Sequence, residues 1–343
     1  MHIPLPYDEH TVTPVVSTGD LPPPEQIVAH VTEAHEMYRN LDDGAVADYI
    51  PALAQTPPGL FGISVVGIGG GAIEVGDCHV EFSIQSDSKP FVFALICNAL
   101  GHDAAREKLG VNGTGLPFNS VMAVELHEER TMNPLVNAGA IATTSLIPGD
   151  SAEDKFDHIL DGLSRFAGRP LHVIDEVYAS ESAANQRNHG IAALLRSYDR
   201  LYFDPEQATD IYTRQCSIGV TTHDLAVMGA TLADGGVNPV TGEQVIEERH
   251  CKRVLAVLAT AGLYEHSGEW LYEVGLPGKS GVSGGVVTIA PGKGSLAVFS
   301  PPLDDVGNSV RGQRVTKYLS EMLGLNLFAS RPRPAVEPEA PAV

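Results

Sequence analysis

The segment VEFSIQSDSKPFVFALICNAL, residues 80–100, places a β-like run directly before an apolar helix. The stretch Val80–Gln85 favours a strand, and Lys89–Leu100 predicts a buried helix. Proline lacks an N–H and is tolerated only in the first turn of a helix, so Pro90 puts the helix start near residue 87. We therefore expect Ser86 at or beside the helix N-cap, with Lys89 three residues further on the same face.

Ser86 and Lys89 are a candidate nucleophile and base. A serine hydroxyl reacts only when a base takes its proton, and a lysine amine can act as that base when its pKa is lowered. Burial and the positive end of a helix both disfavour the ammonium form. The N–H groups of the first turn, including that of Ser86, can face a developing oxyanion. The Ser86–Lys89 spacing alone is weak evidence for catalysis, because a serine N-cap followed by an exposed lysine gives the same pattern.

Strand-like patterns lie toward the two ends of the chain. They predict two β-hairpins, one over Phe61–Val66 and the run from Ala72 around the turn Gly67–Gly71, the other over Val282–Ile289 and Gly294–Phe299. Helical periodicity predicts further helices at Pro24–Leu53, Ala140–Leu146, Asp154–Phe166, Ser182–Leu201, Thr222–Asp234, Glu248–Leu263 and Val310–Leu323.

This order of elements predicts an α/β (α+β) fold, with one antiparallel sheet built from both ends of the chain and flanked by helices. An all-helical subdomain, about residues 91–265, is inserted into an α/β part made from about 25–90 and 266–330. Together they form a single domain over residues 25–330. Residues 1–24 are expected to be flexible and the Pro/Ala/Glu-rich tail 331–343 to be disordered.

Composition narrows the function classes. The chain of 343 residues has a net charge of −21, which disfavours nucleic acid and anionic membranes as partners. Its four cysteines are far apart and form no CxxC pair, and its 13 histidines include no HExxH motif, so we expect no metal site and no cofactor. The N-terminal sequence lacks the basic start and the continuous apolar core of a secretory signal. The sequence also has no run of about 18 apolar residues that could cross a membrane. We therefore expect a cytoplasmic protein.

A series of blocks between about Ile27 and Leu325 resembles the serine-dependent glutaminases, relatives of the β-lactamases and penicillin-binding proteins. The blocks follow one another in the family's order. They are GAVADYIPAL from Gly44, FSIQSDSK from Phe82, PFNS from Pro117, NPLVNAGAI from Asn133, ESAANQRN from Glu181, YTRQCSI from Tyr212, ADGGVNP from Ala233, GVSGG from Gly281 and FSPPLD from Phe299.

The resemblance implies a β-lactamase-like fold, a homodimer or homotetramer, and hydrolysis of L-glutamine to L-glutamate and ammonia. It makes Ser86 the nucleophile and Lys89 its base, and it brings Tyr264 near Ser86 as a proton relay. The backbone N–H of Val282 would join that of Ser86 in the oxyanion hole. Amide and phenol groups suit the substrate carboxylate, and a glutamate suits its ammonium. The implied substrate contacts are Tyr49, Ser86, Asn137, Glu181, Asn188, Tyr212, Tyr264 and Val282.

Two positions depart from the family pattern. Asp87 stands where an apolar residue is common, and the loop from Asn112 has an unusual form. A first-turn carboxylate suits the helix dipole, but Asp87 could also keep Lys89 protonated, which would weaken the role of that lysine as a base. Both interpretations of Asp87 remain open at this point.

Three further stretches resemble motifs of other enzyme or binding-site classes. The stretch 281–285 fits GxSxG, but a β-like run follows it and no histidine occurs after His266. The stretch 67–72 fits GxGxxA, but a strand follows it where a dinucleotide site needs a helix. Lys279-Ser280-Gly281 resembles the KTG motif of β-lactamases and penicillin-binding proteins, which keeps a serine hydrolase of that type as an alternative. A non-catalytic glutamine-binding protein is the other alternative, although it would have no use for the Ser86–Lys89 pair.

Overall fold

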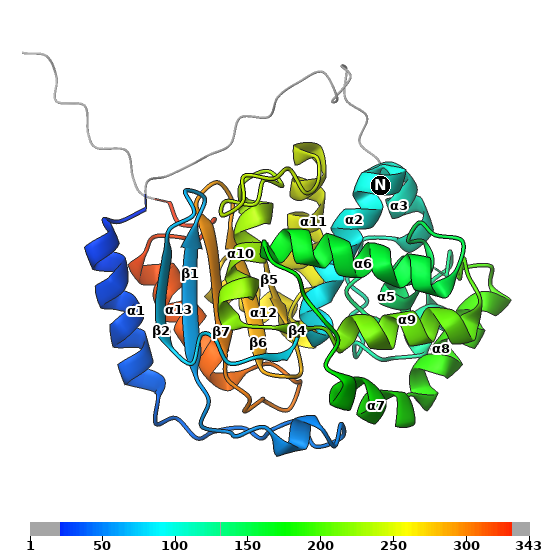
Figure 1. The fold of residues 1–343 in the computed structure, drawn as a ribbon, viewed down its shortest axis with the longest axis horizontal. Coiled ribbons are helices and arrows are strands. Elements are labelled where there is room, and N and C mark those ends of the chain that lie inside the picture. Colours follow the sequence, from blue (N-terminus) through cyan, green and yellow to red (C-terminus); the bar gives the residue numbers. More distant parts are fainter. Residues whose placement is uncertain (1–20, 131, 331–343) are drawn as a thin grey trace, which may run out of the picture.

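A five-stranded antiparallel sheet organises the computed structural model, which describes residues 21–130 and 132–330 (Figure 1). The strand order is β2-β1-β7-β6-β5, so strands from the two ends of the chain meet where β1 pairs with β7. The predicted sheet built from both ends is therefore confirmed. Its strands are β1 (Gly62–Gly67), β2 (Ala72–Gly76), β5 (Gly278–Ser280), β6 (Gly285–Ala290) and β7 (Gly294–Phe299).

Both predicted hairpins form, β1 with β2 and β6 with β7. The first strand of the second hairpin begins at Gly285, not at Val282 as predicted. Residues 281–284 form a tight turn instead, in which Gly284 has φ 105° and the Gly284 N–H donates to the Gly281 carbonyl. A side chain at position 284 would clash with the Ser300 carbonyl, so the turn requires glycine there. Strand β5, only Gly278–Ser280, was not predicted.

Helices cover both faces of the sheet (Figure 1). Helices α1 (Pro24–Tyr38) and α13 (Val310–Met322) pack on one face, and α10 (Thr222–Ala233) packs against β1, β6 and β7 on the other. A helical block lies beyond α10. Because both faces of the sheet are covered by helices, β1, β6 and β7 are almost wholly buried. The remaining α-helices are α2 (Lys89–Leu100), α3 (His102–Leu109), α4 (Met122–Leu126), α5 (Asn137–Ser145), α6 (Ala152–Ala167), α7 (Asp175–Ala183), α8 (Gln186–Ser197), α9 (Pro205–Cys216), α11 (Glu248–Ala261) and α12 (Ser267–Glu273).

Two predicted helices are shorter than expected. The first ends at Tyr38 rather than Leu53, because the chain turns to pair Ala45 with Leu303. Gly44 makes this approach possible with φ 92°, and a Cβ at that position would lie 2.5 Å from the Leu303 carbonyl oxygen. The predicted helix Ser182–Leu201 is instead the end of α7 and all of α8, which are separated at Asn185. The buried Asn185 side chain hydrogen-bonds Thr213 there, a contact with α9 that periodicity could not reveal.

The start of α2 also differs in detail from the prediction. Helix α2 begins at Lys89, its N-cap is Ser88, and Ser86 lies in a preceding 3₁₀ turn, η2 (Gln85–Ser88). The β-like run before it is reduced to β3 (Phe82–Ser83), which pairs with β4 (Gly219–Val220) in a separate two-stranded sheet. Ser86 is thus held one turn before the α-helix rather than at its N-cap. The flexible segment and disordered tail predicted for residues 1–24 and 331–343 lie, apart from 21–24, outside the described residues.

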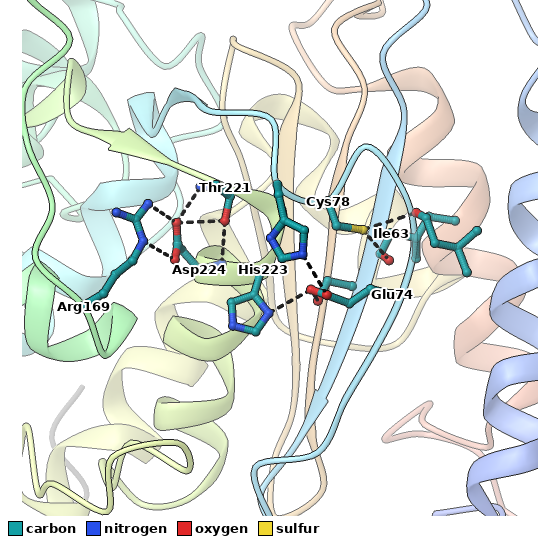
Figure 2. A network of polar contacts seen from close by, with 10 residues as sticks. Ile63, Glu74, Cys78, Arg169, Thr221, His223 and Asp224 are labelled. Atoms are coloured by element: carbon teal, nitrogen blue, oxygen red, sulfur yellow. Dashed lines mark hydrogen bonds and ion pairs between the residues drawn. The ribbon is translucent and has the colours of Figure 1, made fainter.

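A polar network ties the start of α10 to its neighbours (Figure 2). Asp224 and Thr221 form a capping box, and the Arg169 guanidinium donates to both Asp224 oxygens at 2.8 and 2.6 Å. Nearby, His223 Nδ1 lies 2.8 Å from Glu74 Oε1, which links α10 to the edge strand β2. The Asp224 carboxylate is 2 % exposed, so its partners matter more than those of a surface ion pair.

Replacing Asp224 by alanine should therefore lower the free energy of unfolding by about 2–4 kcal/mol, because the change removes a helix cap and leaves Arg169 without its main acceptor. Urea denaturation followed by circular dichroism measures this. Glu243→Ala, which breaks the exposed Arg165–Glu243 pair, is the control and should cost less than about 1 kcal/mol. Equal losses in the two variants would contradict the assigned role of the buried pair.

Candidate active site

Lys89, the base expected from the sequence, is buried. It begins α2, is 1 % exposed, and its Nζ donates to Asn137 Oδ1 at 2.8 Å and to the Leu135 carbonyl at 3.3 Å. Burial lowers the pKa of Lys89 to about 8, although attraction to Cys216 and Asp87 acts in the opposite direction. About a tenth of this amine is therefore unprotonated at pH 7, and this is the form that a general base requires.

Asn137 connects Lys89 to the predicted substrate contacts. It is the first residue of α5, and its backbone N–H donates to the Phe118 carbonyl at 2.8 Å. Its Oδ1 accepts hydrogen bonds from Lys89 and from the Tyr212 hydroxyl, the latter at 3.3 Å. Its Nδ2 donates to Asn188 Oδ1 at 3.1 Å. Residues from α2, α5, α8 and α9 thus form one hydrogen-bonded polar cluster.

Glu181 supplies the negative charge on the other side of this cluster. It lies on α7, is partly exposed, and accepts a hydrogen bond from the Gln85 side-chain amide. Loss of water contact raises the pKa of Glu181 to about 7, while the Gln85 hydrogen bond acts against that rise. Gln85 directly precedes the nucleophile candidate and has φ 50°, an unusual backbone conformation for a residue with a side chain.

Ser86 lies beside the Tyr264 phenol. Ser86 is 6 % exposed, and a hydrogen bond from it is one of the influences on the pKa of Tyr264, which burial raises well above its ordinary value. The Tyr264 hydroxyl donates to the Ser280 carbonyl at 2.8 Å, and Tyr264 has φ 55° in the 3₁₀ turn η3 (Tyr264–His266). Within the described residues, Lys89 makes no hydrogen bond to Ser86, and the hydrogen bond of Ser86 is with the Tyr264 phenol, which burial keeps neutral.

Val282 lies in the tight turn 281–284 and packs with Tyr264 and Leu303 in a small apolar cluster. Its side chain is 6 % exposed, and its backbone N–H has no backbone acceptor within the part of the chain that the structure describes. A free backbone donor in a turn held by glycines is suited to binding an oxyanion.

Asp87 turns out to be wholly buried, so it is not a surface acid at a helix start. Burial raises its pKa to about 8, although attraction to Lys279 and then to Lys89 lowers it. Burial also dominates the pKa of Lys89, where the effect of Asp87 is smaller and of opposite sign. Asp87 therefore does not keep Lys89 at the pKa of an ordinary lysine.

Tyr49 lies at the outer edge of the site. It is 58 % exposed, in the loop that precedes the 3₁₀ turn η1 (Leu53–Gln55), and the charge of Glu181 and the phenol of Tyr264 both lie near enough to interact with it electrostatically. All the site residues expected from the sequence therefore come together, although they arise from separate elements. Two further residues at the site were not expected from the sequence. Gln85 hydrogen-bonds Glu181, and the Phe118 ring lies 4.7 Å from the Tyr264 ring. Both residues belong to sequence blocks that resemble the family, which is the signal that could have identified them.

A separate cavity of about 920 Å³ lies beside α3 and α4, and none of the expected site residues lines it. Its lining includes acidic, basic and apolar side chains, so it has no single chemical character. We therefore place the candidate active site at the Lys89–Asn137 cluster and not in this cavity.

Comparisons with known proteins show the family of this chain. A family model described as Glutaminase matches residues 44–328. Glutaminase 2 of Yersinia pestis is 55 % identical over 92 % of this chain and 93 % of its own length. The solved structure titled probable glutaminase ybaS has 44 % identity and a TM-score of 0.88 over 90 % of this chain and all of its own.

A covalent complex of the Bacillus subtilis glutaminase YbgJ with 5-oxo-L-norleucine is also similar. It shares 30 % identity and a TM-score of 0.78 over 89 % of this chain and 99 % of that one. These neighbours share the antiparallel sheet with flanking helices of the β-lactamase-like fold, as the sequence predicted. The family match covers well over half of the chain, and the identities and coverages are high. The chain therefore belongs to the glutaminase family.

Proposed function

We propose that this amidohydrolase converts L-glutamine to L-glutamate and ammonia with Ser86 as nucleophile and Lys89 as its base. The single observation that carries the proposal is the hydrogen-bonded path from the buried Lys89 amine through Asn137 to Asn188. The Glu181 carboxylate lies near enough to Tyr212 of the same cluster to interact with it electrostatically. This path joins a base of lowered pKa to groups that can hold the two charged ends of a free amino acid.

Substrate binding depends on complementary charge and hydrogen bonding. The ionised Glu181 carboxylate would accept hydrogen bonds from the substrate ammonium, and the Asn188 amide and Tyr49 hydroxyl would donate to its carboxylate. Tyr212 and Asn137 would orient the chain of the substrate toward Ser86. With the α-groups fixed, the length of the substrate side chain decides whether its amide carbon reaches Ser86.

The first chemical step forms an ester. Ser86 Oγ attacks the side-chain amide carbon while its proton passes to Lys89, directly or by way of the Tyr264 phenol. The oxyanion accepts hydrogen bonds from the N–H groups of Ser86 and Val282. The C–N bond then breaks, the leaving nitrogen takes the proton and departs as ammonia, and a γ-glutamyl ester of Ser86 remains.

The second step hydrolyses that ester. A water molecule gives its proton to the same base and attacks the ester carbonyl, which passes through a second oxyanion in the same hole. Collapse breaks the bond to Ser86 Oγ, which takes back a proton, and glutamate leaves. The similar structures titled for a covalent complex of YbgJ and for Mglu in its glutamate form support a covalent route and a glutamate-sized product.

Ser86→Ala should abolish ammonia release from glutamine, with a loss in kcat of at least about 10⁴-fold, because no nucleophile remains. Intact-protein mass spectrometry with 6-diazo-5-oxo-L-norleucine should show one covalent adduct on the unmodified protein and none on this variant. Ser88→Ala changes a buried serine two residues away and should still form the adduct. An adduct on Ser86→Ala would assign the nucleophile to another residue.

The rate should rise with pH. Burial lowers the pKa of Lys89 to about 8, so its base form accumulates as pH increases, and kcat should rise about 50-fold from pH 6 to pH 8. The pKa of Glu181 is raised to about 7, so its carboxylate is lost below that pH and KM should increase there. Steady-state kinetics from pH 6 to 9 separate the two effects, and Glu181→Gln should remove only the change in KM. A flat kcat profile would rule out Lys89 as the base.

Asparagine should be a poor substrate. Its side chain is one methylene shorter, so its amide carbon cannot reach Ser86 while its α-groups remain at Glu181 and Asn188. We expect kcat/KM for asparagine to be at least about 10³-fold below that for glutamine in the same ammonia-release assay. Comparable values would show that the α-groups are not anchored as proposed.

The cytoplasmic location of the protein and its oligomeric state remain predictions. Among the described helices, none is long and apolar enough to cross a membrane. We propose a homodimer or homotetramer by likeness to the family, and analytical ultracentrifugation of the full chain would test it. The alternative of a β-lactamase-type hydrolase predicts turnover of nitrocefin, whereas our proposal predicts none.

A further inference from the structure

Lys279 is a second buried lysine that the proposed mechanism leaves without a role. It lies on β5, is 0 % exposed, and its Nζ is 4.2 Å from the centre of the Tyr264 ring. The same Nζ donates to the Ser280 carbonyl at 2.5 Å, and the Tyr264 hydroxyl donates to that carbonyl at 2.8 Å. Lys279 and Tyr264 therefore both donate to the Ser280 carbonyl oxygen. A change at Lys279 would alter the surroundings of the phenol beside Ser86.

Asp87 faces this arrangement from η2. A Cβ added at Gly281 would lie 2.5 Å from Asp87 Oδ2, and one added at Gly285 would lie closer still, so the carboxyl group packs against the turn that carries Val282. Neither Asp87 oxygen has a hydrogen-bond partner within the described residues. An unsatisfied buried carboxyl is costly, which makes Asp87 a poor choice for stability alone and favours a role for its charge or proton.

We propose that Asp87 and Lys279 act together as a net-neutral pair of buried groups, with no direct hydrogen bond between them, and that they position the Tyr264 phenol and the Val282 turn around Ser86. Asp87 provides the counter-charge that a lysine at position 279 needs in an apolar setting. Together the two groups hold one titratable proton, so they add no net charge beside the proposed nucleophile, whichever of them carries it. Asp87 and Lys279 are positioning residues, because they act through Tyr264 and the turn. The inference rests on the proposed function.

Several groups face the pair and bear on its charge. Lys89 approaches from α2 and repels Lys279, and Asp87 attracts both lysines. Tyr264 from η3 is neutral because burial raises its pKa, and Cys216 from α9 interacts electrostatically with both Tyr264 and Lys89. A neutral Asp87–Lys279 pair therefore leaves the titration of Lys89 under the control of its own burial.

The pair itself is tested by thermal unfolding of the full chain. Asp87→Asn and Lys279→Met should each lower Tm, and the double variant should lower Tm by clearly less than the sum, since neither partner is then left alone. Additive losses in Tm would contradict the pairing of Asp87 with Lys279. Asp87→Ala only removes atoms and serves as a second variant at position 87. This readout needs no activity, so it decides the pair even if the wild-type protein released no ammonia and the proposed function failed.

Kinetics test the positioning role. Asp87→Asn should lower kcat for glutamine about 10- to 100-fold and leave KM within about 2-fold, because the α-group contacts are elsewhere. The midpoint of the pH rise should stay within about 0.3 pH unit, since the pair is neutral before and after the change. Asp224→Asn, at a buried aspartate of an ion pair outside the site, should leave kcat within about 2-fold. An unchanged kcat plateau with a midpoint at least about one pH unit lower would show that Asp87 acts on Lys89 and not through Lys279.

Discussion

Withdrawal of the Lys89 amine from water is the constraint on which the rest of the site depends. Helix α2 is apolar and buried along its first turns, so the charged form of an amine at its first residue is disfavoured by several kcal/mol unless it is compensated. The two acceptors supplied, Leu135 O and Asn137 Oδ1, are neutral. They accept hydrogen bonds from the amine but provide no negative charge. The pKa of Lys89 therefore stays low, and the amine loses its proton easily.

The architecture provides this burial and brings the proposed reacting groups together from two sides. Helix α2 is enclosed within the helical block, while Tyr264 and Val282 approach from the side of the sheet. Strained or glycine-dependent backbone occurs where these parts meet, at Gln85, Tyr264 and Gly284. Such conformations are commonly retained where a fold must direct backbone or side-chain groups at a reacting centre, because regular helices and strands cannot place them there.

Periodicity and motif spacing predicted most elements of the fold, and family resemblance predicted the residues of the site. The hairpins and α2 were clear because their patterns are long and their turns contain glycine. The break at Asn185 was missed because a buried contact with Thr213, distant in sequence, decides it. The environment of Asp87 was equally hidden: its sequence neighbours suggested a first-turn acid, but strand β5 and its turn enclose it. Short strands such as β5 carry too few residues for any pattern to be recognised.

The pairing of β1 with β7 has a consequence for how the protein is made. These strands are the central neighbours of the sheet, yet they lie near opposite ends of the chain, at residues 62–67 and 294–299. A ribosome delivers the segment with the proposed nucleophile first, and the turn that carries Val282 and the strand β7 emerge much later. Such non-local closure is slow, and a nascent chain cannot complete the reactive centre. The proposed site can therefore assemble only after residue 299 has left the ribosome.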